Sequence, residues 1–203
     1  LVNASGTARF HNASIAADVA GGELGGLKLS QTSFLMADYK APILEIDGKA
    51  GGDLQQALAY VQASPLGPII GGQFMGLTGS GPAQYQVKLS LPVISAEVLA
   101  AMPAPPTPRD YAVRAMLGGV TVALPALRAP AQRVEGTFEL HNYEVNIAGL
   151  RGTIFDGPFE LSASPGRTYG DVEAAVELTA KGRAGGARLP AFIGLPATIA
   201  MSG

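Results

Sequence analysis

Polar and apolar residues alternate with a period of two along much of this chain. The clearest run covers residues 84–91, and further runs cover 137–141, 159–162 and 171–178. Successive side chains of a strand point to opposite faces, so each run describes a strand with one apolar and one polar face. Such two-faced strands are typical of antiparallel sheets. The pattern therefore predicts a mainly antiparallel, all-β fold.

Turn-forming residues support this prediction. The 203 residues include 27 Gly and 15 Pro, about a fifth of the chain against a usual share of roughly 12%. One segment departs from the strand pattern: Asp53 can cap a helix, and apolar residues then recur at helical spacing up to Val61. We expect one clear helix at about 53–63 and at most a second short one at 189–193.

The chain also repeats itself. The sequence Gly-Thr-Ala-Arg-Phe-His-Asn at 6–12 returns in related form at 136–142, and residues 44–52 return in related form at 178–186. The offsets are 130 and 134, which indicates a duplication with a four-residue insertion. Prolines crowd residues 102–108, as in an exposed connection. We predict a first β section at 1–101, a Pro-rich loop at 102–110 and a second β section at 111–203.

Composition excludes several classes of function. A net charge of −2 lacks the basic footprint of a nucleic-acid-binding protein. The absence of Cys excludes disulfides, thiolate zinc sites and thiol catalysis. The sequence holds no run of about 18 apolar residues that could form a membrane span. Its first residues read as the interior of a strand-and-turn pattern, so we expect an internal section of a longer chain.

Candidate catalytic residues are few. His11 and His141 occupy the same position of the repeat, before an Asn, and this favours dispensable surface histidines over a duplicated active site. The Gly-rich stretch 76–81 lacks the Lys-Ser/Thr of a phosphate-binding loop. Carboxylates such as Glu45 and Asp47 are explained as solvated strand positions. The sequence predicts no enzyme, no metal site and no cofactor.

The apolar side of the strands consists mainly of small or aliphatic residues, and aromatic residues make up only 6% of the chain. Small side chains fill a core poorly, because close packing requires volume. A curved sheet with an unfilled apolar face could bind acyl chains. An ordinary filled core explains the same pattern, and both interpretations stay open at this point.

Several segments, in this order, resemble one known family. They are the stretch 44–52 with the helix after it, the Ala-Ser-Pro-Leu-Gly at 63–67, the Gly-Ser-Gly-Pro at 79–82 leading into 87–92, and the segments 117–125 and 134–140. Together they resemble the large AsmA-like proteins of Gram-negative bacteria, most closely the YhdP type. The resemblance implies repeated curved sheets that form an open apolar groove (a β-taco), within a protein anchored in the inner membrane. It also implies a periplasm-spanning bridge that moves phospholipid towards the outer membrane and maintains its barrier.

On this basis the partners are phospholipid acyl chains and neighbouring repeats of the same longer chain, with membrane contact only through parts outside this sequence. The runner-up is a non-catalytic β-repeat spacer or adhesin-like segment with a filled core. We expect an aspartate at Leu140 or Val176 to block the groove without unfolding it, and Glu139 and Glu177 to face away. The apolar positions expected to line the groove are Phe138, Leu140, Phe159, Leu161, Val172, Val176, Leu178, Val87 and Leu89.

Overall fold

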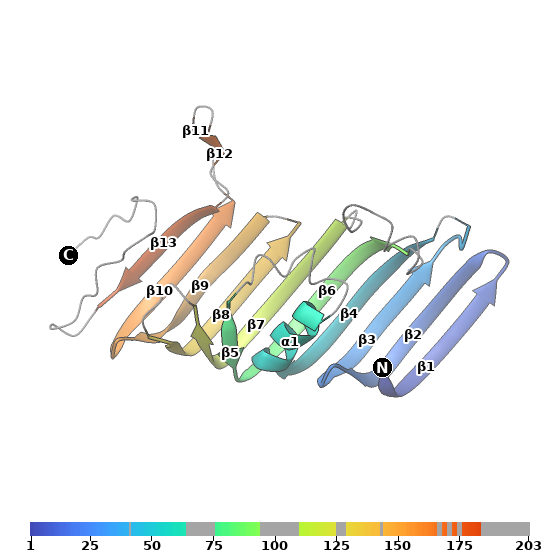
Figure 1. The fold of residues 1–203 in the computed structure, drawn as a ribbon, viewed down its shortest axis with the longest axis horizontal. Helices are drawn as coiled ribbons and strands as arrows, with labels where there is room; N and C mark the ends of the chain where they lie inside the picture. The colour runs from blue at the N-terminus through green and yellow to red at the C-terminus, as the bar shows by residue number, and fades with distance from the viewer. Residues whose placement is uncertain are drawn as a thin grey trace.

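A computed structural model describes residues 1–40, 42–63, 76–93, 110–124, 129–142, 144–165, 168–169, 172–173 and 176–183. Among these residues, eleven strands form one sheet, two more form a separate hairpin, and there is a single α-helix. The sheet is open and uncurled, with β1 and β13 at its two edges (Figure 1). The predicted class, mainly antiparallel all-β with a short helix, is confirmed.

The strands follow one another across the sheet almost in chain order. The path is β1-β2-β3-β4-β6-β7-β8-β9-β10-β13, and β5 pairs with β7 beside this path. Neighbours on the path are antiparallel. The strands are β1 (Val2–His11), β2 (Ser14–Leu24), β3 (Leu27–Met36), β4 (Ile43–Asp53), β5 (Thr78–Ser80), β6 (Pro82–Pro92), β7 (Asp110–Ala123), β8 (Ala131–His141), β9 (Glu144–Ile154), β10 (Gly157–Pro165) and β13 (Val176–Gly182).

The register separates the side chains into two faces, because residues directly opposite each other in a ladder lie on the same side of the sheet. One row of successive partners is apolar and runs Ala50, Tyr85, Ala115, Phe138, Ile147, Ala163 and Leu178. The row one residue away is polar and runs Lys49, Gln86, Arg114, Glu139 and Asn146. We call the two sides the apolar face and the polar face.

The helix α1 (Leu54–Ala63) begins where the sequence predicted it. Asp53 caps it, because the Asp53 Oδ1 accepts a 2.8 Å hydrogen bond from the backbone N–H of Gln55. Its apolar side packs on the apolar face: Leu54 and Leu58 contact the Val120 cluster, and Val61 contacts the Leu140 cluster. The helix therefore covers the central strands of the sheet (Figure 1).

The predicted duplication is visible in the strand order. Strands β1, β2 and β3 correspond to β8, β9 and β10 at an offset of 130, and β4 corresponds to β13 at an offset of 134. The hairpin of β11 (Thr168–Tyr169) and β12 (Val172–Glu173) lies between β10 and β13. This is the place where the offset changes, so the hairpin accounts for the insertion.

The backbone repeats as well as the sequence. Asn12 and Asn142, the first residues of the turns after β1 and β8, have positive φ angles of 48° and 53°. Asn tolerates this left-handed conformation better than most other residues. Asn3 and Arg133, also 130 residues apart, share positive φ angles of 50° and 51°. Equivalent strands thus bend and turn at equivalent residues.

The predicted division into two β sections stays a prediction. Strands β6 and β7 pair from Ala83 with Leu117 to Ser90 with Asp110, so one sheet includes strands from both sections. Residues 102–109 of the predicted loop, and the second helix expected at 189–193, lie outside the described residues.

Candidate functional site

The apolar face is most tightly packed beneath α1. Three side chains are almost fully buried there: Val120 is 0% exposed, Leu140 is 1% exposed and Tyr111 is 2% exposed. Leu140 packs with Leu89 and Tyr111, and Val61 of the helix contacts this group. The centre of the face therefore has a filled core.

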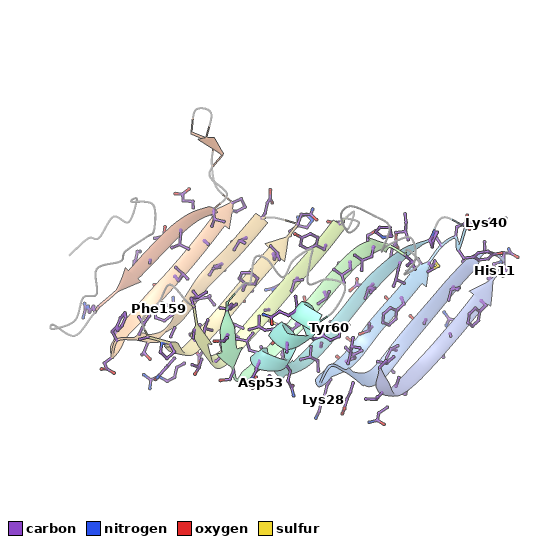
Figure 2. The ribbon with its side chains drawn as sticks, in the orientation of Figure 1. His11, Lys28, Lys40, Asp53, Tyr60 and Phe159 are labelled. Carbon is purple, nitrogen blue, oxygen red and sulfur yellow. The ribbon has the colours of Figure 1, made fainter. Side chains whose placement is uncertain are left out.

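The register places eight of the nine predicted lining residues on the apolar face. Val87, Leu89, Phe138 and Leu140 lie on the central strands, in or against the buried clusters. Phe159 and Leu161 of β10 pack against the cluster around Val134. Figure 2 shows Phe159 on the opposite side of α1 from His11. Their role as a lipid lining stays a prediction.

The edge strand β13 carries two more of the predicted residues. Leu178 pairs with Ala163, and Val176 pairs with Pro165, so both belong to the apolar face. Leu178 is 45% exposed. The expected control positions point the other way: Glu177 alternates with these residues, and Glu139 forms an ion pair with Arg114 on the polar face.

Val172 is not on this face. The sequence pattern suggested one continuous strand over 171–178, but Val172 belongs to β12, which pairs only with β11 in the small hairpin. The strand that adds to β10 begins at Val176. Val172 therefore lies in the hairpin inserted between β10 and β13 and not in the sheet. The alternation of apolar and polar residues nevertheless runs on from Val172 into β13.

The structure also changes the expectation for Leu140. An aspartate there was expected to leave an open groove folded, but Leu140 lies in a closed cluster. An unpaired charge in such a cluster must be desolvated, so the substitution is now expected to destabilise the fold.

Sequence reasoning missed two apolar side chains at the other edge. Phe10 of β1 and Ile15 of β2 are direct partners, and they are 75% and 37% exposed. Ile15 pairs with Met36, and Met36 pairs with Leu44, so Phe10 and Ile15 extend the apolar face. The repeat offset could have identified them, because Phe10 corresponds to Leu140.

The polar face carries ion pairs between neighbouring strands. Each is exposed, and pairs of this kind contribute only about 0–1 kcal/mol. A shallow hollow of about 420 Å³ lies among them, next to Lys88, Arg114 and Glu139. The pairs are Arg9–Asp18 (3.5 Å), Lys88–Asp47 (3.2 Å), Arg114–Glu139 (3.3 Å), His141–Asp110 (3.0 Å) and Arg151–Glu160 (3.2 Å).

Both histidines lie at the surface and contact one polar side chain each. His11 Nε2 lies 3.1 Å from Asn12 Nδ2, and His141 Nε2 lies 3.0 Å from Asp110 Oδ1; all four residues are exposed. Across the part of the chain that the structure describes, no three His, Asp or Glu residues cluster as metal ligands would.

One buried polar group stands out beneath the helix. Tyr85 is 8% exposed, and its hydroxyl has no hydrogen-bond partner among the described residues. Burial, together with the negative charge of Asp53, raises the pKa of Tyr85 from 10.0 to about 12. This phenol is therefore a neutral member of the apolar core.

Comparison with known proteins identifies the family of this chain. No described helix is both long and apolar enough to cross a membrane. No curated protein and no solved structure matches the sequence. The family model described as "YhdP protein" matches residues 1–203, the whole sequence. With its repeated antiparallel strands and open sheet, the chain belongs to the YhdP family.

Proposed function

We propose that this chain is a section of a lipid-transfer bridge whose apolar face carries phospholipid acyl chains between the inner and outer membranes. One observation supports this most strongly: two rows of apolar partners cross the same face of the sheet, and neither holds a charged side chain. One row runs from Phe10 on β1 to Leu91 on β6. The other runs from Ala50 on β4 to Leu178 on β13. Each methylene removed from water on such a surface contributes about 0.8 kcal/mol. An acyl chain can therefore be held without any directional contact.

The helix divides this surface. It covers the central strands, while exposed apolar side chains remain on both sides of it, at Phe10 and Ile15 and again at Leu178. In our proposal the acyl chains lie on these two uncovered parts. Phe10, Ile15 and Leu178 offer no hydrogen-bonding side-chain group to a headgroup, which would stay in water.

Membership of the YhdP family supports the wider setting. We place the chain in the periplasm, as part of a protein anchored in the inner membrane, where it supports the barrier of the outer membrane. Neighbouring repeats of the longer chain would extend the sheet at the edge strands β1 and β13. Contact with either membrane would be made by parts outside these 203 residues.

The second candidate is a structural spacer with a filled core. The near-complete burial of Val120, Leu140 and Tyr111 beneath α1 favours it. Native mass spectrometry of the purified chain, with lipid extraction in parallel, separates the two functions. Copurifying phospholipid supports the bridge, and a lipid-free protein supports the spacer.

Photo-crosslinking locates the lipid. A benzoylphenylalanine at Leu178 or Phe10 should capture phospholipid, because both side chains are exposed on the apolar face. The matched controls are Glu177 and Arg9, each one residue away on the polar face. Equal capture from both faces would reject the lipid track.

A further inference from the structure

Strand β1 lies at the edge of the sheet, whereas its repeat equivalent lies inside the sheet. All ten of its residues are exposed, and its ladder partner in the described structure is β2 alone. Its repeat equivalent, β8, lies between β7 and β9. Because β1 and β2 reproduce β8 and β9, the pairing of β7 with β8 shows how a further strand would meet β1.

The register of that further strand follows from the offset of 130. In the observed pairing, Val113 of β7 lies opposite Leu140, and Ala115 lies opposite Phe138. The corresponding residues of β1 are Phe10 and Ala8. A strand docked in this register would place an apolar side chain beside Phe10, which is 75% exposed, as Val113 lies beside Leu140.

The turn after β1 has the same backbone conformation as the turn after β8, where Asn142 binds the start of β7. Asn142 Oδ1 accepts a 3.1 Å hydrogen bond from the backbone N–H of Tyr111, and the Asn142 N–H donates to the Tyr111 carbonyl at 2.8 Å. Asn12 has the same left-handed backbone as Asn142. It therefore holds its backbone N–H at the equivalent place in the turn, while its amide Nδ2 lies 3.1 Å from His11 Nε2.

Among the positions that differ between β1 and β8, one reverses its charge. Arg114 of β7 lies opposite Glu139 and forms an ion pair with it at 3.3 Å. The residue of β1 that corresponds to Glu139 is Arg9. A strand identical to β7 would place Arg114 opposite Arg9, and like charges directly opposite each other are destabilising.

We propose that β1 is the docking edge for an antiparallel strand with the pattern of β7 but with an acidic residue where β7 has Arg114. The charge difference between Arg9 and Glu139 then distinguishes β1 from β8, so that each accepts a different strand. The inference deepens, and rests on, the proposed role of β1 as a junction with a neighbouring repeat. It does not depend on lipid binding.

A labelled peptide tests this directly. The peptide carries the β7 sequence, residues 110–123, with Arg114→Glu, and its binding to the 203-residue chain is measured by fluorescence anisotropy beside the unchanged peptide. We expect the Arg114→Glu peptide to bind about fivefold more tightly, from one exposed ion pair gained and one like-charge contact avoided. Hydrogen exchange should show new protection in β1.

Variants of the chain supply the controls. Arg9→Glu should reverse the preference between the two peptides, whereas Lys181→Glu on the opposite edge strand β13 should leave it unchanged. Phe10→Asp should abolish binding, and Phe10→Leu, which copies Leu140, should retain it. Because Phe10 is exposed, neither variant should change the circular dichroism spectrum.

Several outcomes would overturn the proposal. These are no binding of either peptide, equal binding of both, or protection confined to β13. Self-association of the chain through β1, seen by sedimentation and lost in Phe10→Asp, would make a second copy the occupant instead. The lipid proposal is tested by a different measurement, the phospholipid that copurifies with the chain in the absence of peptide. The two proposals can therefore fail independently.

Discussion

Asp53 and Gly81 are joined by a 2.8 Å hydrogen bond in which the Gly81 N–H donates to Asp53 Oδ2. The other oxygen of the same carboxylate caps α1, and the N–H of Leu54 donates to the Gly81 carbonyl at 2.9 Å. Gly81 itself has a φ of +111°, a conformation that favours glycine. One carboxylate therefore both starts the helix and fixes its position over the strands that it covers.

Asp53→Ala should lower the free energy of unfolding by about 1–2 kcal/mol, the usual effect of losing a helix cap. Urea denaturation monitored by circular dichroism measures this. Asp53→Asn should retain part of the stability, because an amide oxygen can still accept one of the two bonds. Asp38→Ala is the matched control, because Asp38 caps an exposed turn outside any helix; it should cost less than about 0.5 kcal/mol. Equal losses at Asp53 and Asp38 would contradict the role of Asp53.

Leu140→Asp should destabilise the fold by more than about 3 kcal/mol, because it places an unpaired charge in a closed cluster. Leu178→Asp should leave the fold intact, since Leu178 is already 45% exposed at the edge strand. If the bridge is correct, Leu178→Asp also reduces the phospholipid that copurifies. Thermal melting and lipid extraction of both variants give the two results. A folded Leu140→Asp protein would show that the centre of the sheet is an open groove after all.

Stability should fall in strongly alkaline solution. The pKa of Tyr85 is raised to about 12 in the folded chain, against about 10 in an unfolded one. The folded state therefore keeps this proton more firmly, so the contribution is complete below pH 10 and is lost as the pH rises towards 12. Unfolding experiments between pH 8 and 12 should show this decline.

Tyr85→Phe should remove the share of the alkaline decline that comes from Tyr85. At pH 7 it should be neutral or slightly stabilising, because the hydroxyl has no partner among the described residues. The exposed Tyr39→Phe provides the control. A clear loss of stability in Tyr85→Phe at pH 7 would mean that the hydroxyl has a stabilising partner.

Replacing both His11 and His141 by Gln should change the free energy of unfolding by less than about 0.5 kcal/mol at each position. Both rings are exposed, and the pair of His141 with Asp110 lies on the surface. Chemical denaturation at pH 7 measures the change. Loss of cellular function in a folded double variant would restore a catalytic or metal-binding role.

The all-β class, the helix and the duplication could be predicted from the sequence because each depends on neighbouring residues. Alternation such as that at 84–91 assigns strand faces without knowledge of any partner. Asp53 can cap a helix through an N–H only two residues away. The repeat offset of 130 relates Asn12 to Asn142, and both residues are left-handed in the structure.

The alternation of residues shows which side chains share a face of the sheet, but the burial of each side chain follows from contacts that form only in the folded chain. Leu140 and Phe10 hold the same position of the repeat, but β7 and α1 cover the first and no strand of the described structure covers the second. Val172 keeps the alternation of its neighbours but pairs with β11, away from the sheet. Burial depends on partners distant in the chain, and a local pattern carries no information about which partner arrives.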